Sequence, residues 1–427
     1  MKNKVESVKG TRDFYPQDMA FRNWLYGHIK NVSESFGASE WDGPYLERLE
    51  LYAAKSGEEL VKEQSFVFKD RGGDEVALRP ELTPSLARMV AQRQRELIYP
   101  LRWWAFSPFW RYERPQKGRT REFFQWNIDV IGENNTETDT ELISIAIHFF
   151  KRLGLSGDQV KVFINDRRLM DAQLKSIGVS EDQKSSVFRL IDRRDKMRLD
   201  EWKQYAFDLG LSDAVFAGVN DLLQNPDLYL ESPDLVRMFK LLSLLGLDEY
   251  VKFDPRVIRG LDYYTGVVFE ARKNDNSGRA ILGGGHYDNL VSDVGGEPLP
   301  GVGFAMGDIM IRVVLEELGL IPMFSASPAD VLVTIFDNDS VDRAFQRAQE
   351  IRSTGINVIC IPTPQKLQKQ IKYADRYGIP YVIIEGPEEL KAGTVVLKSL
   401  KTGEQETVLI NQLGEKIKNL LAEQSAL

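Results

Sequence analysis

The first third of the chain mixes two hydrophobic patterns. In residues 18–36, and again in residues 138–153, apolar side chains recur every three or four positions, which predicts two helices. Residues 66–78 instead alternate apolar and polar side chains around a Gly-Gly turn, which predicts a β-hairpin. A further helix is predicted from Thr83, as its N-cap, through Pro84 in the first turn to about residue 95.

Farther along the chain the pattern changes twice. Residues 165–253 are rich in charge and leucine and carry few strand signals, so we expect a mostly helical insertion. Strand patterns return at residues 256–271 and 280–285, and a helix is predicted at residues 307–319. After a linker-like stretch that begins at Ile321, strands and helices alternate, which is typical of a separate α/β domain of about one hundred residues.

Candidate chemistry concentrates in residues 109–132, which read FWRYERPQKGRTREFFQWNIDVIG. The segment predicts a strand, a basic turn that contains proline and glycine, and a second strand. In the second strand Gln125, Asn127 and Asp129 share one face, and the apolar residues between them share the other. This pattern suits arginines that bind a polyphosphate beside a polar wall for a small ligand; a solvated surface turn is the alternative.

Composition narrows the classes of function. The chain has 55 Lys and Arg against 63 Asp and Glu, and the net charge of −8 argues against nonspecific nucleic-acid binding, although grouped cations could still bind a shaped RNA. One cysteine excludes an internal disulfide, and three histidines disfavour a multi-histidine metal site. The dipeptide Gly-Lys is missing, which excludes a P-loop. We see no secretory signal or membrane span and expect a cytoplasmic protein.

Three more segments could carry chemistry. In IRGLDYYTGVVFE, Arg259 precedes a glycine at the start of a strand, and the functional and structural interpretations are equally open. In LGGGHYDNL, consecutive glycines indicate a close backbone approach, for which packing is the simpler explanation. In LRPELT, Glu81 precedes the predicted helix, where its carboxylate could complement the helix N-terminus or anchor a substrate ammonium.

Together these segments resemble histidyl-tRNA synthetase, a class II aminoacyl-tRNA synthetase, over essentially the whole chain. WDGPYLERLELY resembles motif 1, with Pro44 at a dimer interface, WRYERPQKGRTREFFQ is similar to motif 2, and GVGFAMGD resembles motif 3. IRGLDYYTGVVFE and LGGGHYDNL are similar to two histidine-specific signatures. The resemblance implies an α+β catalytic domain with an antiparallel sheet flanked by helices, a mostly helical insertion, and a C-terminal α/β anticodon-binding domain. The implied boundaries are 1–322 for the catalytic domain, with the insertion at about 165–253, 323–328 for the linker, and 329–427 for the anticodon-binding domain.

The resemblance also implies an activity and its residues. A homodimer would attach L-histidine to the 3′ end of tRNA(His) through a histidyl-adenylate, using ATP with Mg²⁺ that arrives on the nucleotide. ATP would contact Arg111, Glu113, Arg119 and Arg259, and the catalytic residues would be Arg259, Arg111 and Gln125. Histidine would contact Glu81, Thr83, Gln125, Asp129, Tyr263, Tyr264 and Tyr287, and the tRNA would contact Gln116 and Lys117.

Two positions depart from the pattern that is usual in the family. Motif 3 commonly carries an arginine that binds the γ-phosphate, but Met310 stands there, with Arg312 two residues on. His286 replaces a commoner arginine in the second histidine signature. The alternatives are a regulatory subunit of ATP phosphoribosyltransferase and an accessory nucleic-acid-binding subunit. Such paralogues typically lose the anticodon-binding domain or the histidine signatures, both of which this chain retains.

Overall fold

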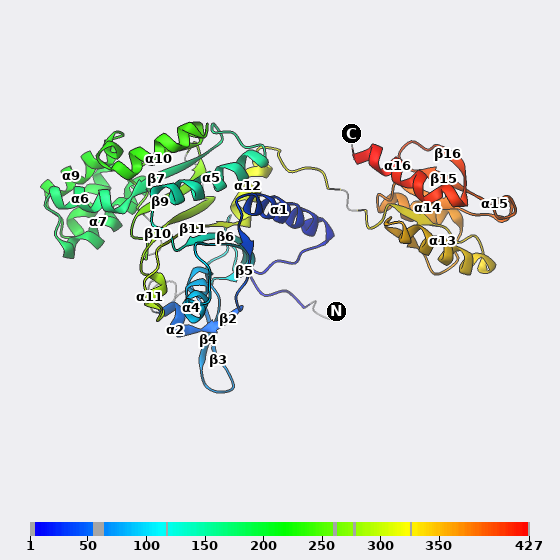
Figure 1. Cartoon of the computed structure of the whole chain (residues 1–427), viewed down its shortest axis with the longest axis horizontal. Coiled ribbons are helices and arrows are strands. Elements are labelled where there is room, and N and C mark those ends of the chain that lie inside the picture. Colours follow the sequence, from blue (N-terminus) through cyan, green and yellow to red (C-terminus); the bar gives the residue numbers. More distant parts are fainter. Residues whose placement is uncertain are drawn as a thin grey trace. The chain divides into compact units, whose positions relative to one another are not determined.

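The computed structural model describes residues 5–53, 64–116, 118–258, 263–275, 279–324 and 327–425. Its contacts divide the chain into two compact units, each with its own sheet (Figure 1). The larger unit contains residues 22–321 together with the residues before Phe14, and the smaller contains Phe14–Phe21 with the residues from Pro322 onward. Among the described helices, none is both long enough and apolar enough to cross a membrane.

The larger unit is built on an eight-stranded sheet. Neighbouring strands run antiparallel except at the two edges, where β1 pairs with β5 and β7 pairs with β8 in parallel. In spatial order the strands are β1 (Ser39–Glu40), β5 (Leu101–Trp110), β6 (Glu122–Ile131), β11 (Gly301–Gly307), β10 (Leu282–Tyr287), β9 (Val267–Lys273), β7 (Val160–Asp166) and β8 (Val251–Phe253). This arrangement confirms the antiparallel sheet, and it places β6, β11 and β10 side by side at its centre. The strand predicted at residues 256–271 is observed as the shorter β9, which begins at Val267.

The two faces of β6 have different surroundings, as the alternation of its residues predicts. The apolar face packs against α5 (Thr136–Arg152), where the rings of Trp126 and Phe149 lie 5.0 Å apart. Helices α1 (Pro16–Ser35) and α12 (Asp308–Glu317) also contact this part of the sheet (Figure 1). The opposite face of β6 carries the polar residues and is left to line a cavity.

The larger unit also contains a smaller antiparallel sheet of three strands. It orders β2 (Leu46–Arg48), β4 (Glu75–Leu78) and β3 (Phe66–Lys69), which confirms the predicted hairpin, and it is followed by α4 (Thr83–Arg93). The prediction that Thr83 caps α4 is wrong: Leu82 is the N-cap and makes no side-chain capping bond, and Thr83 is already helical. The buried guanidinium of Arg79 instead anchors this entry, because its Nε donates to Pro108 O at 3.0 Å and its Nη1 to Asp42 Oδ1 at 2.6 Å.

Helices occupy most of the chain between β7 and β8. The short helix η1 (Arg194–Lys196) is held near the main sheet, since Arg256 Nη1 lies 2.9 Å from Asp195 Oδ1. The core of this helical region contains the buried Trp202, whose Nε1 donates to Leu190 O at 2.7 Å. The other described helices here are α6 (Arg167–Ser176), α7 (Glu181–Arg193), α8 (Leu199–Asp208), α9 (Asp213–Gln224), η2 (Leu228–Glu231), α10 (Pro233–Leu244) and η3 (Asp248–Tyr250). The remaining short helices of the larger unit are α2 (Leu49–Ala53) and α11 (Leu290–Asp293).

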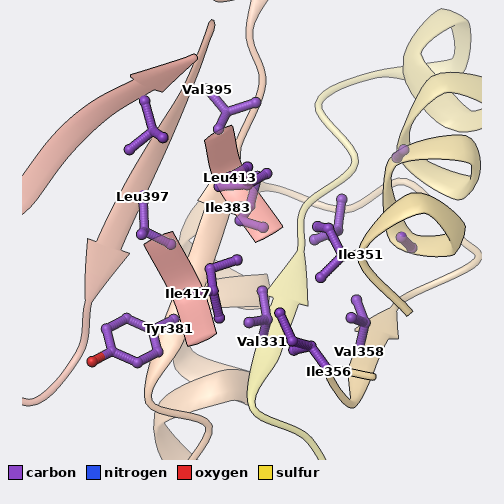
Figure 2. Packing of buried hydrophobic residues seen from close by; sticks show 14 of the residues in the cluster. Val331, Ile351, Ile356, Val358, Tyr381, Ile383, Val395, Leu397, Leu413 and Ile417 are labelled. Carbon is purple, nitrogen blue, oxygen red and sulfur yellow. The ribbon is translucent and has the colours of Figure 1, made fainter. Parts of the chain in front are cut away.

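The smaller unit is an α/β domain with helices on both faces of a five-stranded sheet. Alternate residues of strand β12 (Val331–Val333) face opposite ways. Val331 packs with α13 (Val341–Ser353) and α16 (Leu413–Ser425), as Figure 2 shows, and Val333 belongs to the same cluster, whereas Leu332 packs with α14 (Leu367–Arg376). The strand order is β13 (Val358–Cys360), β12 (Val331–Val333), β14 (Tyr381–Ile384), β15 (Thr394–Ser399) and β16 (Gln405–Leu409). The helices are η4 (Asn338–Ser340), α13 (Val341–Ser353), α14 (Leu367–Arg376), α15 (Pro387–Ala392), η5 (Ile410–Gln412) and α16 (Leu413–Ser425).

Candidate active site

Two cavities adjoin on the polar side of β6 and share the side chains of Arg111 and Gln125. The smaller cavity brings together every residue that the sequence assigned to histidine. Its lining residues are Glu81, Thr83, Arg111, Gln125, Asn127, Asp129, Tyr263, Tyr264, Tyr287, Gly303, Phe304 and Ala305. These residues come from the start of α4, from three neighbouring strands and from the segment before β9, so the fold assembles the set from distant parts of the chain.

Asp129 is the acidic group at the end of the polar row on β6. It is only 4% exposed, and its Oδ1 accepts a hydrogen bond from the Tyr287 hydroxyl at 2.9 Å. Burial raises the pKa of Asp129 to about 7, although the hydrogen bond from Tyr287 opposes this shift. With a pKa of about 7, the Asp129 carboxyl is only partly ionised near neutral pH, and a donor or a cation beside it favours the ionised form.

Three tyrosines enclose the space beside Asp129. The ring of Tyr263 lies edge-on to both Tyr264 and Tyr287, with centroids 5.1 and 5.9 Å away. Burial raises the pKa of each of these phenols, and the charge of Asp129 raises it further. They remain neutral hydrogen-bonding groups at physiological pH, which suits a wall around a small aromatic ligand.

The position of Asp129 depends on the glycine that pairs with it on the next strand. Gly303 of β11 lies opposite Asp129 in the ladder. A Cβ atom at Gly303 would lie 2.1 Å from Asp129 Oδ1 and 2.8 Å from the Ile128 carbonyl oxygen. Any side chain at this position would displace the carboxylate, so glycine is required here for close approach rather than for an unusual backbone angle.

The larger cavity, of about 740 Å³, is lined by more cations than carboxylates. Arg111 links it to the smaller cavity: its Nε donates to Pro80 O at 2.9 Å, and its guanidinium carbon lies 5.3 Å from the centre of the Phe123 ring. Burial lowers the pKa of Arg111, and the carboxylates Glu81 and Glu113 raise it. The residues that line this cavity are Arg111, Glu113, Gly118, Arg119, Thr120, Phe123, Gln125, Asp195, Lys196, Glu270, Arg272, Arg279, Ala280, Ile281, Gly307, Ile309 and Met310.

The basic turn predicted from the sequence contributes directly to the larger cavity. Arg119 Nη1 lies 2.8 Å from Glu113 Oε2, and both side chains line the cavity. Gln116 is exposed and exchanges backbone hydrogen bonds with Arg119, which closes the turn. Lys117 and Arg259, predicted to contact tRNA and ATP respectively, lie outside the described residues.

Sequence reasoning missed several residues of the larger cavity. Asp195 and Lys196 come from the helical segment, and Glu270 and Arg272 come from β9. Arg279 precedes β10 and carried no recognisable signal, because only the sheet brings it next to the basic turn. An alternation count along β9 could have shown that Glu270 and Arg272 share a face, but not that this face meets the arginines.

His286 has a structural environment that the sequence did not reveal. It is buried, and its Nδ1 lies 2.9 Å from Asp139 Oδ1 while its Nε2 lies 3.3 Å from Asp288 Oδ1. Burial lowers the pKa of His286, but the hydrogen bond and the charges of these two carboxylates raise it by more, so the net shift is upward. The ring ties β10 to α5 immediately beside Tyr287, and it faces away from the set of residues that line the smaller cavity.

The described residues contain no cluster of three or more histidine, cysteine or acidic side chains arranged to hold a metal ion. The acidic residues of the larger cavity are instead paired with arginines. Besides the pair of Glu113 with Arg119, Glu270 Oε1 lies 2.8 Å from Arg272 Nε. The arrangement can therefore bind a polyanion next to a small polar ligand, with Arg111 at the junction.

Known proteins resemble this chain in sequence and in fold. A family model described as "Histidyl-tRNA synthetase" matches residues 10–309, and one described as "Anticodon binding domain" matches residues 330–420. The chain is 37% identical to a histidine–tRNA ligase of Leptospira biflexa, with 98% of both chains covered. It is 38% identical to a chloroplastic/mitochondrial histidine–tRNA ligase of Arabidopsis thaliana, with 96% of this chain and 86% of the relative covered. The crystal structure of a histidyl-tRNA synthetase from Nostoc sp. PCC 7120 superposes with a TM-score of 0.83 at 26% identity, covering 98% of this chain and all of that one.

Proposed function

This chain belongs to the histidyl-tRNA synthetase family, and we propose that its two adjoining cavities divide the binding of histidine and ATP between them. The chain is a histidine–tRNA ligase: it uses ATP to form histidyl-adenylate and then transfers histidine to tRNA(His). The shared lining of the two cavities by Arg111 and Gln125 carries the proposed division. A regulatory or accessory role has less support, because the curated relatives that match over nearly the full length are ligases.

In the smaller cavity, histidine binds with its imidazole toward Asp129. The carboxylate accepts the ring N–H, and Tyr264 and Tyr287 enclose the ring. Glu81, Thr83 and Gln125 hold the α-ammonium group at the opposite end, where the buried Glu81 supplies the negative charge. Selection of histidine then rests on a buried polar partner that other amino acids would leave unsatisfied.

In the larger cavity, ATP extends away from Arg111. Arg111 contacts the α-phosphate, and Arg119, oriented by Glu113, contacts the outer phosphates. Histidine's carboxylate oxygen attacks the α-phosphorus and pyrophosphate leaves, a step that requires alignment and fixed positive charge rather than a nucleophilic side chain. Mg²⁺ enters with ATP as part of the substrate and neutralises phosphate charge. Arg259, predicted to join Arg111 at the α-phosphate, remains part of the proposal.

Two further features belong to the proposal. The turn at Gln116 and Lys117 meets the acceptor end of tRNA(His), and Gln116 is exposed as that role requires. We also propose a homodimer and a cytoplasmic location. The small sheet supports the dimer, because its hairpin projects from the larger unit (Figure 1), and exposed apolar side chains lie on this hairpin and at the start of the neighbouring strand β2. Those side chains are Tyr45, Leu46, Val67 and Phe68, each between 41% and 48% exposed.

A pair of substitutions tests the division between the cavities. In histidine-dependent ATP–pyrophosphate exchange, Asp129→Ala should raise the KM for histidine by roughly 100-fold and leave the KM for ATP nearly unchanged, because a charge-assisted bond to the imidazole is lost. Arg119→Ala should do the reverse, raising the KM for ATP by roughly tenfold or more. If either variant shifts both constants equally, the proposed division is wrong.

A further inference from the structure

Arg279 lies directly before β10 on the wall of the larger cavity. Its Nη1 atom is buried, and no described residue accepts a hydrogen bond from it. Within the described part of the chain, its guanidinium also lacks an ion pair. The side chain is partly exposed, but a buried N–H group without an acceptor is unfavourable. An anionic ligand that supplies this acceptor is therefore the expected partner.

The carboxylates of the cavity are already paired with other arginines. Five cations line the cavity (Arg111, Arg119, Lys196, Arg272 and Arg279) against three carboxylates (Glu113, Asp195 and Glu270). Each carboxylate is already within ion-pair distance of another arginine: Glu113 of Arg119, Glu270 of Arg272, and Asp195 of Arg256. Burial and the positive charge of Arg119 lower the pKa of Arg279, and the charge of Glu113 raises it. Arg279 and Arg119 therefore share the field of one carboxylate, which is already paired with Arg119.

The position of Arg279 shows which part of an anion it would reach. A Cβ atom added to Gly118 would lie 2.6 Å from Met310 Sδ and 4.0 Å from Arg279 Cδ. Arg279, Met310 and the tip of the basic turn therefore meet at one place in the cavity wall. Met310 contributes no charge there, whereas Arg279 reaches the same place from the segment that precedes β10.

We propose that Arg279 binds the terminal phosphate of ATP and supplies, from the start of β10, the positive charge that Met310 of α12 does not provide. This inference rests on the proposed binding of ATP in the larger cavity. It assigns Arg279 to the outer phosphates together with Arg119, and it leaves the α-phosphate to Arg111. Arg279 is thus a substrate-binding residue for ATP and for its product, pyrophosphate.

The test compares ligands that carry or lack the outer phosphates. In the full-length protein, Arg279→Ala should raise the KM for ATP in the exchange reaction by roughly 10- to 100-fold, and the KM for pyrophosphate in the reverse reaction by a similar factor. The KM for histidine and the dissociation constant for AMP should change by less than about threefold. Arg279→Lys should fall between the wild type and Arg279→Ala, because it keeps the charge but loses the planar fork.

Arg312→Ala is the matched control. Arg312 lies on α12, two residues after Met310. Its Nε donates to Glu316 Oε1 at 2.8 Å, and its side chain does not line the cavity. Its removal should leave the KM for ATP unchanged. The proposal is overturned if Arg279→Ala binds ATP and pyrophosphate normally, if it weakens AMP as much as ATP, or if Arg312→Ala gives the larger defect. Failure of the wild-type protein to exchange would instead overturn the proposed function itself.

Discussion

At the residue scale, Asp129 combines two demands that oppose each other. Recognition of an imidazole N–H requires an ionised carboxylate, but burial beside Tyr264 and Tyr287 disfavours that charge while the cavity is empty. The pKa of Asp129 in the folded chain is raised to about 7, against 3.8 for the unperturbed group. Between these values the folded chain holds a proton that the unfolded chain has released, so this group makes the fold less stable as the pH rises from about 4 to about 7.

Asp129→Asn should therefore stabilise the ligand-free protein at alkaline pH. Above pH 7 the wild-type chain carries an unfavourable contribution of at most roughly 4 kcal/mol that a neutral asparagine avoids. Asparagine also keeps an oxygen that can accept the Tyr287 hydroxyl. Urea unfolding should show the variant to be more stable than wild type at pH 8, with a difference that shrinks toward pH 5. Equal stability at pH 8 would show that the carboxylate is not raised in pKa.

The residue scale also shows the limit of sequence reasoning. Gln125, Asn127 and Asp129 were predicted to share a face because strand alternation is a local property, and they do line one cavity. Arg279 could not be identified in the same way. Its role depends on β10 lying two strands from β6 and on the basic turn reaching over the sheet, neither of which is encoded in the residues around it.

At the element scale, the pairing of β6 with β11 sets the shape of the smaller cavity. The register places Gly303 against Asp129, and the missing side chain leaves space for the carboxylate. The helices predicted at residues 18–36, 138–153 and 307–319 lie near the observed bounds of α1, α5 and α12, because their hydrophobic periods are long and regular. The short α15 (Pro387–Ala392) and β16 (Gln405–Leu409) were not predicted, because few of their residues are buried and their patterns are weak. The start of α4 was misplaced by one residue, because Arg79 rather than a capping hydroxyl fixes it.

Gly303→Ala should strongly reduce histidine activation. The added methyl group would overlap Asp129 Oδ1 and force the carboxylate out of line, a displacement that should lower kcat/KM for histidine by at least about 100-fold. The measurement is pyrophosphate exchange at varied histidine concentration, with circular dichroism as the check on folding. Gly27→Ala is the control, because a methyl group at this position of α1 would meet no atom within 4 Å. Near-normal exchange by Gly303→Ala would contradict the placement of the histidine site.

At the scale of the whole molecule, the exposed apolar side chains of the small sheet predict self-association. The chain has a mass of 48.7 kDa, so a dimer has a mass of about 97 kDa, twice that value. Phe68→Glu should shift sedimentation equilibrium from dimer toward monomer, since an apolar contact would be replaced by a buried charge. Phe345→Glu is the matched control, because Phe345 is similarly exposed, at 44%, but belongs to the C-terminal unit. A monomeric wild type, or an equal effect of both substitutions, would contradict the proposed dimer surface.

The central claim is that this chain activates histidine with ATP and charges tRNA(His) with it. The most direct measurement is ATP–pyrophosphate exchange by the purified full-length protein with ATP and Mg²⁺, with and without L-histidine. We expect exchange that depends on histidine and is not supported by other amino acids at the same concentration, because the buried Asp129 carboxylate and the tyrosines around it suit a donor on a small aromatic ring. Exchange that is missing with histidine, or equally fast with another amino acid, would contradict the account.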